Sequence, residues 1–275
     1  MSVHFLVIVA SARRRGNSDL LGHLALRQAF KHDIDSGEIV YLKDFELQQC
    51  RGCLTCLKED QKCPLEDDLY RLLGIIQDAG KLLLIAPVYV LTIPGTLKLL
   101  LDRYLAISQY LNAQTTGHAA SIGVAALADW HQFQQPLMNL LLLALGRRVV
   151  SSAVVYGAGP GEVLLNDSVA AVQSTVTELI DHKDEPYESV TQDYCPIDRS
   201  RMFEHVDGDK FRCPICLTPA TLSKEGYRFR AEDLNNHRWT GIKLQNHFEN
   251  WILKTRPRFK EMLRQIVQEK RKLGL

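Results

Sequence analysis

Short, unbroken apolar runs alternate along the first 180 or so residues with longer segments whose apolar residues recur at helical spacing. The runs predict buried strands at residues 4–10, 37–42, 81–88, 119–127 and 149–157. The helical spacing predicts helices at 17–30, 66–80, 95–111, 131–145 and 162–182. Strands that are apolar throughout need helices on both faces, so the pattern predicts a doubly wound α/β domain with a five-stranded parallel sheet.

The pattern changes at the polar, charged segment 181–194, which is typical of a linker. A short segment with few large apolar residues then runs to about residue 230, and a basic, partly amphipathic tail follows it. We expect a domain over 1–185, a small cysteine-bearing segment over 186–230 and a basic helical tail over 231–275. The tail predicts a solvated helix that packs on the core or on a second subunit.

Composition narrows the class of protein. Hydrophobic residues make up 46% and charged residues 24% of the chain, and the net charge is +1, so nothing indicates a nucleic-acid partner. No apolar run reaches the roughly 18 residues of a membrane span, and the N-terminal run is too short for a signal peptide. We therefore expect a cytoplasmic protein. In that reducing compartment its seven cysteines, an odd number, are available to metals as thiolates.

The loop after the first strand, "SARRRGNSDLL" (11–21), combines hydroxyl and amide side chains, a glycine and three arginines at the start of a helix. Free N–H groups and the helix dipole make such a place suitable for a phosphate. The loop is neither a G-x-G-x-x-G turn nor a Walker loop. The alternative is a capped helix with solvated arginines.

Four cysteines fall within "CRGCLTCLKEDQKC" (50–63), with the spacing C-x2-C-x2-C-x6-C. Four thiolates in one short loop are suitable ligands for a [4Fe–4S] cluster. A structural zinc site normally pairs two separated C-x2-C units, and a redox dithiol needs only two cysteines. A loop without any metal is the fourth alternative.

The motifs together resemble the flavodoxin-like NAD(P)H-dependent FMN reductase family, and within it the iron–sulfur flavoprotein branch. The first loop of that family has the form G-S-x-R-x-x-G-N-T/S, and residues 10–18 read "ASARRRGNS", with alanine in place of the first glycine. The resemblance implies that FMN phosphate is held by Ser11, Arg13, Asn17 and Ser18. The likeness covers roughly residues 1–180.

Two further loops carry the resemblance. "APVYVLTIPGTLKLLLDR" (86–103) resembles the family's loop after the third strand, although Val90 replaces the usual aromatic residue. "ALADWH" (126–131) stands where the family contacts the edge of the flavin ring, and "VVYGAGPGEV" (154–163) resembles its sequence after the last strand. The implied flavin contacts are Pro87, Val88, Tyr89, Val90, Ala128 and Asp129.

The same resemblance bears on both groups of cysteines. The iron–sulfur flavoproteins carry a compact cysteine loop. The resemblance to them implies a [4Fe–4S] cluster on Cys50, Cys53, Cys56 and Cys63. Farther along, "YCPID" and "RCPIC" look like the two Cys-Pro knuckles of a rubredoxin or zinc ribbon, with residues 199–211 as the hairpin between them. A zinc site would then use Cys195, Cys213 and Cys216, with Asp198, or His205 if the hairpin folds back, as the fourth ligand. A decayed ribbon without metal is the alternative.

The implied function is oxidoreduction. A hydride would pass from NAD(P)H to FMN, and the electrons would leave to a small acceptor such as a quinone or a protein partner, singly if they use the cluster. No side chain is needed as an acid or base in the hydride step, and no catalytic residue is assigned. Two alternatives are an electron carrier that accepts electrons from ferredoxin-like partners and a flavodoxin-like assembly module. Family likeness also implies a homo-oligomer without a membrane partner.

Overall fold

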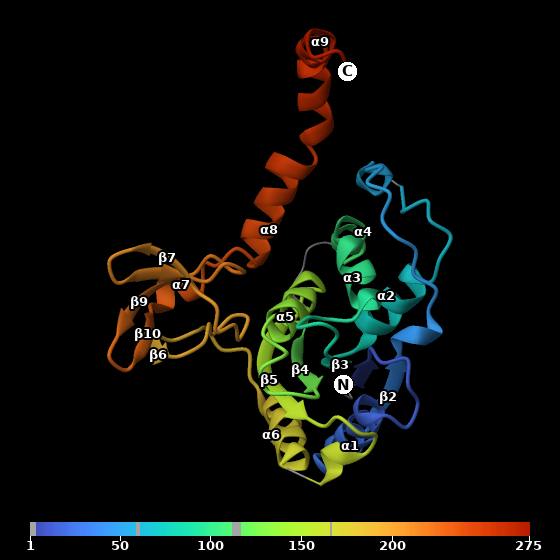
Figure 1. Ribbon diagram of the computed structural model, residues 1–275, viewed down its shortest axis with the longest axis vertical. Helices are drawn as coiled ribbons and strands as arrows, with labels where there is room; N and C mark the ends of the chain where they lie inside the picture. Colours follow the sequence, from blue (N-terminus) through green and yellow to red (C-terminus); the bar gives the residue numbers. More distant parts are fainter. Residues whose placement is uncertain (1–3, 59–60, 112–116, 166) are drawn as a thin grey trace.

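The computed structural model describes residues 4–58, 61–111, 117–165 and 167–275. Five strands form a parallel sheet in the order β2-β1-β3-β4-β5 (Figure 1). Their bounds are β1 His4–Val9, β2 Ser36–Tyr41, β3 Lys81–Pro87, β4 His118–Ala125 and β5 Arg148–Tyr156. The strand order reverses between β1 and β3, which is the point where doubly wound folds bind ligands. The predicted flavodoxin-like fold class is confirmed.

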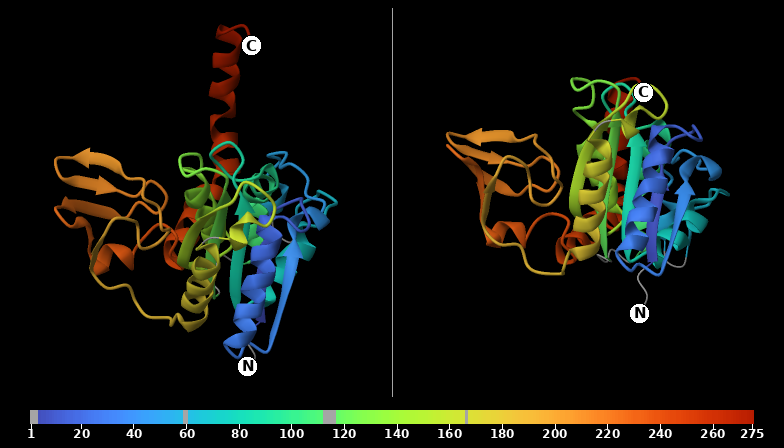
Figure 2. Two further views of the ribbon diagram at one scale, coloured as in Figure 1. Left: turned by 60° about the horizontal axis from the view of Figure 1, so that its bottom comes forward. Right: turned by 90° about the horizontal axis from the view of Figure 1, so that it is seen from below.

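Helices cover both faces of the sheet (Figure 2). One face carries α1 Asn17–Lys31 and α6 Ser168–Asp181. The other carries α2 Leu69–Asp78, α3 Gly95–Asp102, α4 Tyr104–Tyr110 and α5 Gln134–Ala144. Successive residues of each strand point to opposite faces, so each strand contributes to two separate hydrophobic clusters.

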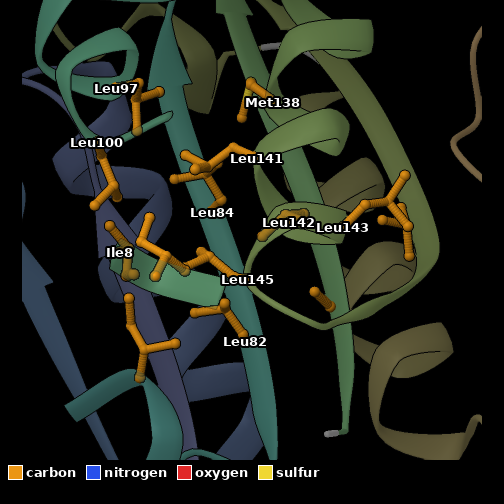
Figure 3. Close-up of a cluster of buried hydrophobic side chains, with 14 of the residues drawn as sticks. Ile8, Leu82, Leu84, Leu97, Leu100, Met138, Leu141, Leu142, Leu143 and Leu145 are labelled. Atoms are coloured by element: carbon orange, nitrogen blue, oxygen red, sulfur yellow. The ribbon is translucent and has the colours of Figure 1, made fainter. Parts of the chain in front are cut away.

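Alternation along β1 shows this division directly. Leu6 and Ile8 join the cluster under α2 to α5, whereas Phe5, Val7 and Val9 join the cluster under α1 and α6. Figure 3 shows the first cluster, in which Leu82 and Leu84 of β3 face Met138 and several leucines of α5. Each fully buried side chain of this kind contributes about 1.5–3 kcal/mol to stability.

Three predicted helices differ from the observed ones, each next to a loop. The predicted helix 95–111 is two helices that meet at Arg103, whose buried guanidinium donates to the Gln48 carbonyl at 3.0 Å. The helix predicted from residue 66 begins at Leu69, because the Asp67 carboxylate accepts the N–H groups of Gln48 at 2.9 Å and Leu69 at 3.2 Å. Likewise, a 3-10 turn at Glu162–Leu164 precedes α6.

A second, antiparallel sheet follows the parallel one, in the order β6-β10-β9-β8-β7. Its strands are β6 Val190–Gln192, β7 Glu204–Asp207, β8 Lys210–Arg212, β9 Pro219–Ser223 and β10 Gly226–Phe229. Phe203 stacks on Tyr227, with 3.9 Å between ring centroids, and also contacts Phe229, while Phe211 packs edge-on against Tyr227, so a group of aromatic side chains holds the sheet together. Figure 1 shows this sheet beside the β5 edge, opposite the β2 edge and its cysteine loop.

The chain ends in helices that leave the body. Short helices α7 Ala231–Leu234 and α8 Gly241–His247 lead through a π-helical turn at Phe248–Ile252 into α9 Thr255–Lys272. Figure 1 shows α9 projecting away from both sheets, and its apolar residues Phe259, Met262 and Leu263 are exposed. Within the described ranges, no helix combines the length and apolarity that crossing a bilayer requires.

Candidate functional site

The loop between β1 and α1 has free polar groups at the carboxyl end of the sheet. Ser11 is buried, and its Oγ accepts the Arg13 N–H at 3.2 Å. Gly16 stands at the N-cap of α1 and supplies no side-chain hydrogen bond, and Ser18 is buried in the first helical turn. The first-turn N–H groups of α1 therefore have no side-chain cap, and they fit an anion such as phosphate.

Asn17 is placed differently from the other expected phosphate ligands. Its amide nitrogen donates to the Gly157 carbonyl at 2.9 Å, and its Oδ1 accepts the Gly161 N–H at 2.7 Å. A Cβ at Gly157 would lie 3.0 Å from the Asn17 amide nitrogen, so glycine permits this close approach. Asn17 thereby joins the first loop to the loop after β5. We assign it to positioning that loop.

Asp19 is a residue that the sequence analysis missed. It is buried, its Oδ2 accepts the Arg15 N–H at 2.5 Å, and its Oδ1 accepts the Tyr41 hydroxyl at 2.5 Å. Burial alone would raise the pKa of Asp19, but the hydrogen bonds from Tyr41 and Arg15 hold it below its usual value. Arg15 has a φ of 58°, so Asp19 holds the loop in a left-handed turn. In the sequence, the signal for this role of Asp19 was a carboxylate three residues after a glycine.

Arg14 connects this loop to the next one along the sheet edge. Its guanidinium pairs with Asp44 at 2.9 Å and lies 3.4 Å over the centroid of the Tyr41 ring. Arg13 is exposed beside it. Asp44 lies six residues before Cys50, so this ion pair links the candidate phosphate loop to the segment that leads into the cysteine loop.

The loop after β3 presents its side chains outward. Tyr89 and Thr92 exchange backbone hydrogen bonds of 2.9 and 3.1 Å, which closes a tight turn. Within it, Val90 has a φ of 47° and is 83% exposed. A β-branched residue in this region is strained, and such strain is typical of binding sites. Pro87, Val88 and Tyr89 complete the expected flavin segment, and Val88 continues the pairing with β4 through the Val124 carbonyl at 2.9 Å.

The loop after β4 lies at the same end of the sheet (Figure 2). Ala128 and Asp129, the expected contacts to the ring edge, are exposed there between Leu127 and Trp130, which are 61% and 57% exposed. The structure thus gathers the three expected flavin segments at the carboxyl ends of β1, β3 and β4. This is the place that a doubly wound sheet offers to a cofactor.

The four cysteines of the first group line one pocket, together with Arg103, Leu105 and Ala106. Cys50 and Cys53 are exposed, whereas Cys56 and Cys63 are half-buried against the core. Burial, and after it the neighbouring thiolates of the other three cysteines, raises the pKa of Cys56. Four cysteines that line one pocket are the ligand type and number that a [4Fe–4S] cluster needs.

This pocket is anchored from the protein interior. Arg103 and Asp67 form an ion pair whose side chains are 1% and 0% exposed, and Arg103 also reaches the Gln48 carbonyl. The Tyr70 hydroxyl accepts the Cys63 N–H at 2.7 Å. Gly52 and Leu54, with φ values of 65° and 57°, turn the chain between the first three cysteines. Arg103 lines the pocket of the thiols with its charge already paired to Asp67, so its role there is to hold the pocket in shape.

The second group forms two equivalent knuckles. Cys195 N–H donates to the Ser200 carbonyl at 2.8 Å and Arg199 N–H to the Cys195 carbonyl at 2.8 Å. In the second knuckle, Cys213 N–H donates to the Thr218 carbonyl at 3.0 Å and Leu217 N–H to the Cys213 carbonyl at 2.9 Å. Arg199 and Leu217 have φ values of 58° and 60°. Asp198 therefore occupies the position that Cys216 holds in the other knuckle.

The knuckles bring Cys195, Asp198, Cys213 and Cys216 together. One ligand atom from each lies within 4.8 Å of the others, and all four side chains are fully buried. Burial raises the pKa of Asp198, as does the Cys213 thiol beside it. Three thiols and one carboxyl group are acceptable ligands for a tetrahedral zinc ion. His205 is elsewhere: its Nε2 lies 3.0 Å from the Gly208 carbonyl in the exposed hairpin.

Both knuckles are docked on the rest of the protein. The Asn139 side chain of α5 donates to the Asp198 carbonyl at 2.8 Å, and Arg199 donates to the Val150 carbonyl of β5. On the other knuckle, the Trp239 indole donates to the Ile215 carbonyl at 3.1 Å. The three cysteines belong to the same hydrophobic cluster as α2 to α5. The small sheet is thereby fixed to the β5 edge.

The fold and its carboxyl-edge loops define a flavodoxin-like protein. The model of the family "NADPH-dependent FMN reductase" matches residues 3–160, and the chain belongs to that family. It is 36% identical over 168 residues to an iron-sulfur flavoprotein of Archaeoglobus fulgidus, covering 59% of this chain and 81% of that protein. An iron-sulfur flavoprotein of Methanocaldococcus jannaschii is 33% identical over 138 residues, 50% of this chain and 70% of the relative.

A solved structure of a flavone reductase is similar in fold to nearly the whole chain. The TM-score is 0.68, and the match covers 97% of each chain at 17% identity. At this identity the likeness concerns architecture alone. The flavodoxin-like part, the small sheet and the tail thus recur together in another protein.

Proposed function

We propose that this chain is an FMN-dependent oxidoreductase that takes electrons from NAD(P)H and passes them to a small acceptor or a protein partner. The observation that carries the proposal is the uncapped start of α1 beside buried Ser11 and Ser18, at the carboxyl edge of the sheet. Membership of the FMN reductase family supports the choice of cofactor.

In this proposal FMN, when bound, supplies the hydride and electron chemistry. Ser11, Arg13, Ser18 and the first-turn N–H groups of α1 bind its phosphate, and Asn17 holds the loop after β5 in place. The strained turn at Val90 and the loop of Ala128 and Asp129 border the ring. No side chain is assigned as an acid or base. We further infer that residues 1–185 carry the redox function, while 186–230 and 231–275 serve structure and association, including a homo-oligomer.

The cysteine loop is the proposed site of a [4Fe–4S] cluster on Cys50, Cys53, Cys56 and Cys63. A second candidate function, an electron carrier that serves protein partners, is favoured by the exposure of Cys50 and Cys53 at the surface. The knuckles are the proposed zinc site. Since they lie at the opposite edge of the sheet from the cysteine loop, we assign their metal a structural role (Figure 1).

The test is anaerobic purification of the full chain, with flavin, iron, sulfide and zinc measured on one sample and NAD(P)H oxidation measured with a quinone acceptor. Replacing Ser11 and Ser18 by alanine should weaken FMN binding by about tenfold or more for each charge-assisted hydrogen bond lost. Ser223→Ala, a change in the small sheet, is the matched control. FMN affinity that is equal in all three proteins would contradict the assignment. NAD(P)H oxidation separates the reductase from the carrier.

A further inference from the structure

A cleft of about 750 Å3 runs along β5, the edge strand of the parallel sheet. Residues 151–154 of β5 form its floor, α5 and α6 form two sides, and residues 199–202 of the first knuckle close it. Its volume falls in the range of about 300–1,000 Å3 that small-molecule sites occupy. Neither the proposed flavin contacts nor the metal ligands use this space.

One end of the cleft adjoins the proposed flavin site. His131 and Tyr156 line that end, with 3.1 Å between His131 Nε2 and Tyr156 Oη. His131 follows Asp129, the expected contact to the ring edge, by two residues. From Tyr156 to Ser151 the strand advances by five residues, or roughly 17 Å at about 3.3 Å each. An extended ligand with one end at the flavin can therefore lie along β5.

The two walls of the cleft carry different chemistry. Arg199 and Arg201 stand on the knuckle wall, and the side chain of Arg201 is 73% exposed in an ion pair with Asp193 at 2.7 Å. The guanidinium of Arg199 donates to the Val150 carbonyl and, at 3.2 Å, to the Tyr194 hydroxyl, so Arg201 is the arginine of this wall that can turn to a ligand. On the α6 wall, Glu178 accepts the Ser174 hydroxyl at 2.8 Å. Arginine forks suit phosphate oxygens, and a carboxylate suits ribose hydroxyls.

Side chains on the free edge of β5 prevent a further strand from pairing with it. Arg199 donates to the Val150 carbonyl, and the Gln135 side chain donates to the Ala153 carbonyl. Since added β-strands bind through such edge carbonyls, these contacts disfavour an extended peptide as the occupant. A small molecule with anionic and hydroxyl groups fits the lining better.

We propose that the cleft binds the adenosine diphosphate ribose arm of a reduced nicotinamide dinucleotide. The pyrophosphate lies on Arg201, and Glu178 accepts a ribose hydroxyl. The inference rests on the proposed function, because it places the nicotinamide at the flavin end of the cleft. Arg201 directly follows the first knuckle, so the cysteine-bearing segment shapes the donor site without carrying electrons.

The experiment compares NADH and NADPH with reduced nicotinamide mononucleotide, which lacks the adenylate arm. Arg201→Ala and Glu178→Gln should each raise the KM for a dinucleotide about tenfold, while the KM for the mononucleotide changes by less than about twofold. Arg201→Lys keeps the charge but loses the fork, and it should show the same split. Arg212→Ala, on the far hairpin and paired with Glu204 at 2.7 Å, is the matched control.

Direct titration with adenosine diphosphate ribose separates the two proposals. Binding that Arg201→Ala weakens supports the cleft even if the full chain oxidises no dinucleotide, which would overturn only the proposed donor. Dinucleotide oxidation with equal KM values in all variants, or no binding of adenosine diphosphate ribose to the full chain, would overturn the cleft assignment.

Discussion

The cysteine loop over residues 50–63 and the knuckles around Cys195 and Cys213 differ in how deeply their thiols are buried and in which contacts hold them. In the knuckles, local backbone hydrogen bonds and two left-handed residues set the geometry, and every ligand atom is buried. In the loop, Cys50 and Cys53 are exposed, and the shape depends on side chains outside the loop: Asp67 and Tyr70 shortly after it, and Arg103 between α3 and α4. One site is built by its own sequence, whereas the other is held by its surroundings.

The difference indicates different roles for the metals proposed at these sites. Three buried thiols and a buried carboxyl group are costly to leave without a cation, so metal binding and folding of the small sheet should be coupled. An exposed loop anchored on a buried ion pair keeps its shape independently and stays accessible to a redox partner. We therefore expect metal loss to unfold one region and to leave the other folded.

Removing one knuckle thiol should produce the largest effect. Cys213→Ser should release zinc and expose residues 190–230 to protease, because structural zinc supplies about 10–16 kcal/mol of folding free energy in small zinc-binding peptides. Cys53→Ser in the loop is the matched change, and it should lower iron content while this segment stays resistant. Metal analysis and limited proteolysis with FMN bound provide the measurement. Zinc retained by Cys213→Ser would refute the coupling.

Breaking the anchor of the loop should have the next largest effect. Arg103→Met leaves Asp67 as a buried, unpaired charge, and we expect a loss of about 3–5 kcal/mol in the free energy of unfolding. Arg71→Met removes the exposed pair with Asp68, where Arg71 is 53% exposed, and should cost less than about 1 kcal/mol. Urea denaturation measures both variants. Similar losses in the two would show that the buried pair is not the anchor.

Replacing Asp198, the one proposed zinc ligand that is not a cysteine, should give the knuckles four thiols, as in the cysteine loop. Asp198→Cys places a fourth thiolate where the equivalent knuckle has Cys216, and zinc should then withstand about tenfold more chelator. Asp198→Asn keeps the shape without the charge and should bind zinc more weakly than the parent protein. Competition with a chelator gives the order of affinities. If the cysteine variant binds no more tightly, the carboxylate is not a ligand.

Acid should destabilise the protein at the linker between the parallel sheet and the small sheet. Burial, and after it the neighbouring Arg148, lowers the pKa of His182 from 6.5 to about 4. The unfolded chain then binds more protons than the folded chain between these values, so stability should fall as the pH drops from about 6.5 to about 4. His182→Asn should flatten this dependence in thermal unfolding, and His205→Asn, on the exposed hairpin, should not. An unchanged slope for His182→Asn would exclude it as the source.

The apolar pattern alone predicted the parallel sheet and its helices, because a strand that is buried on both faces must be apolar along its whole length. Boundaries shifted where side chains have tertiary partners: α2 starts late because Asp67 serves Gln48, and the predicted helix 95–111 divides at Arg103. The role of Asn17 also required the structure, because its partners Gly157 and Gly161 lie about 140 residues away.

The sequence by itself determined the two cysteine groups and the equivalence of Asp198 with Cys216, because knuckle geometry depends on residues within five positions of each other. It also determined the place of the candidate phosphate loop, since the loop directly follows the first strand. Only the tertiary structure decided that His205 lies apart, that Arg103 reaches the cysteine loop and that the first knuckle forms a cleft with β5. These contacts join segments that no local periodicity relates, and packing of the whole chain alone sets their distances.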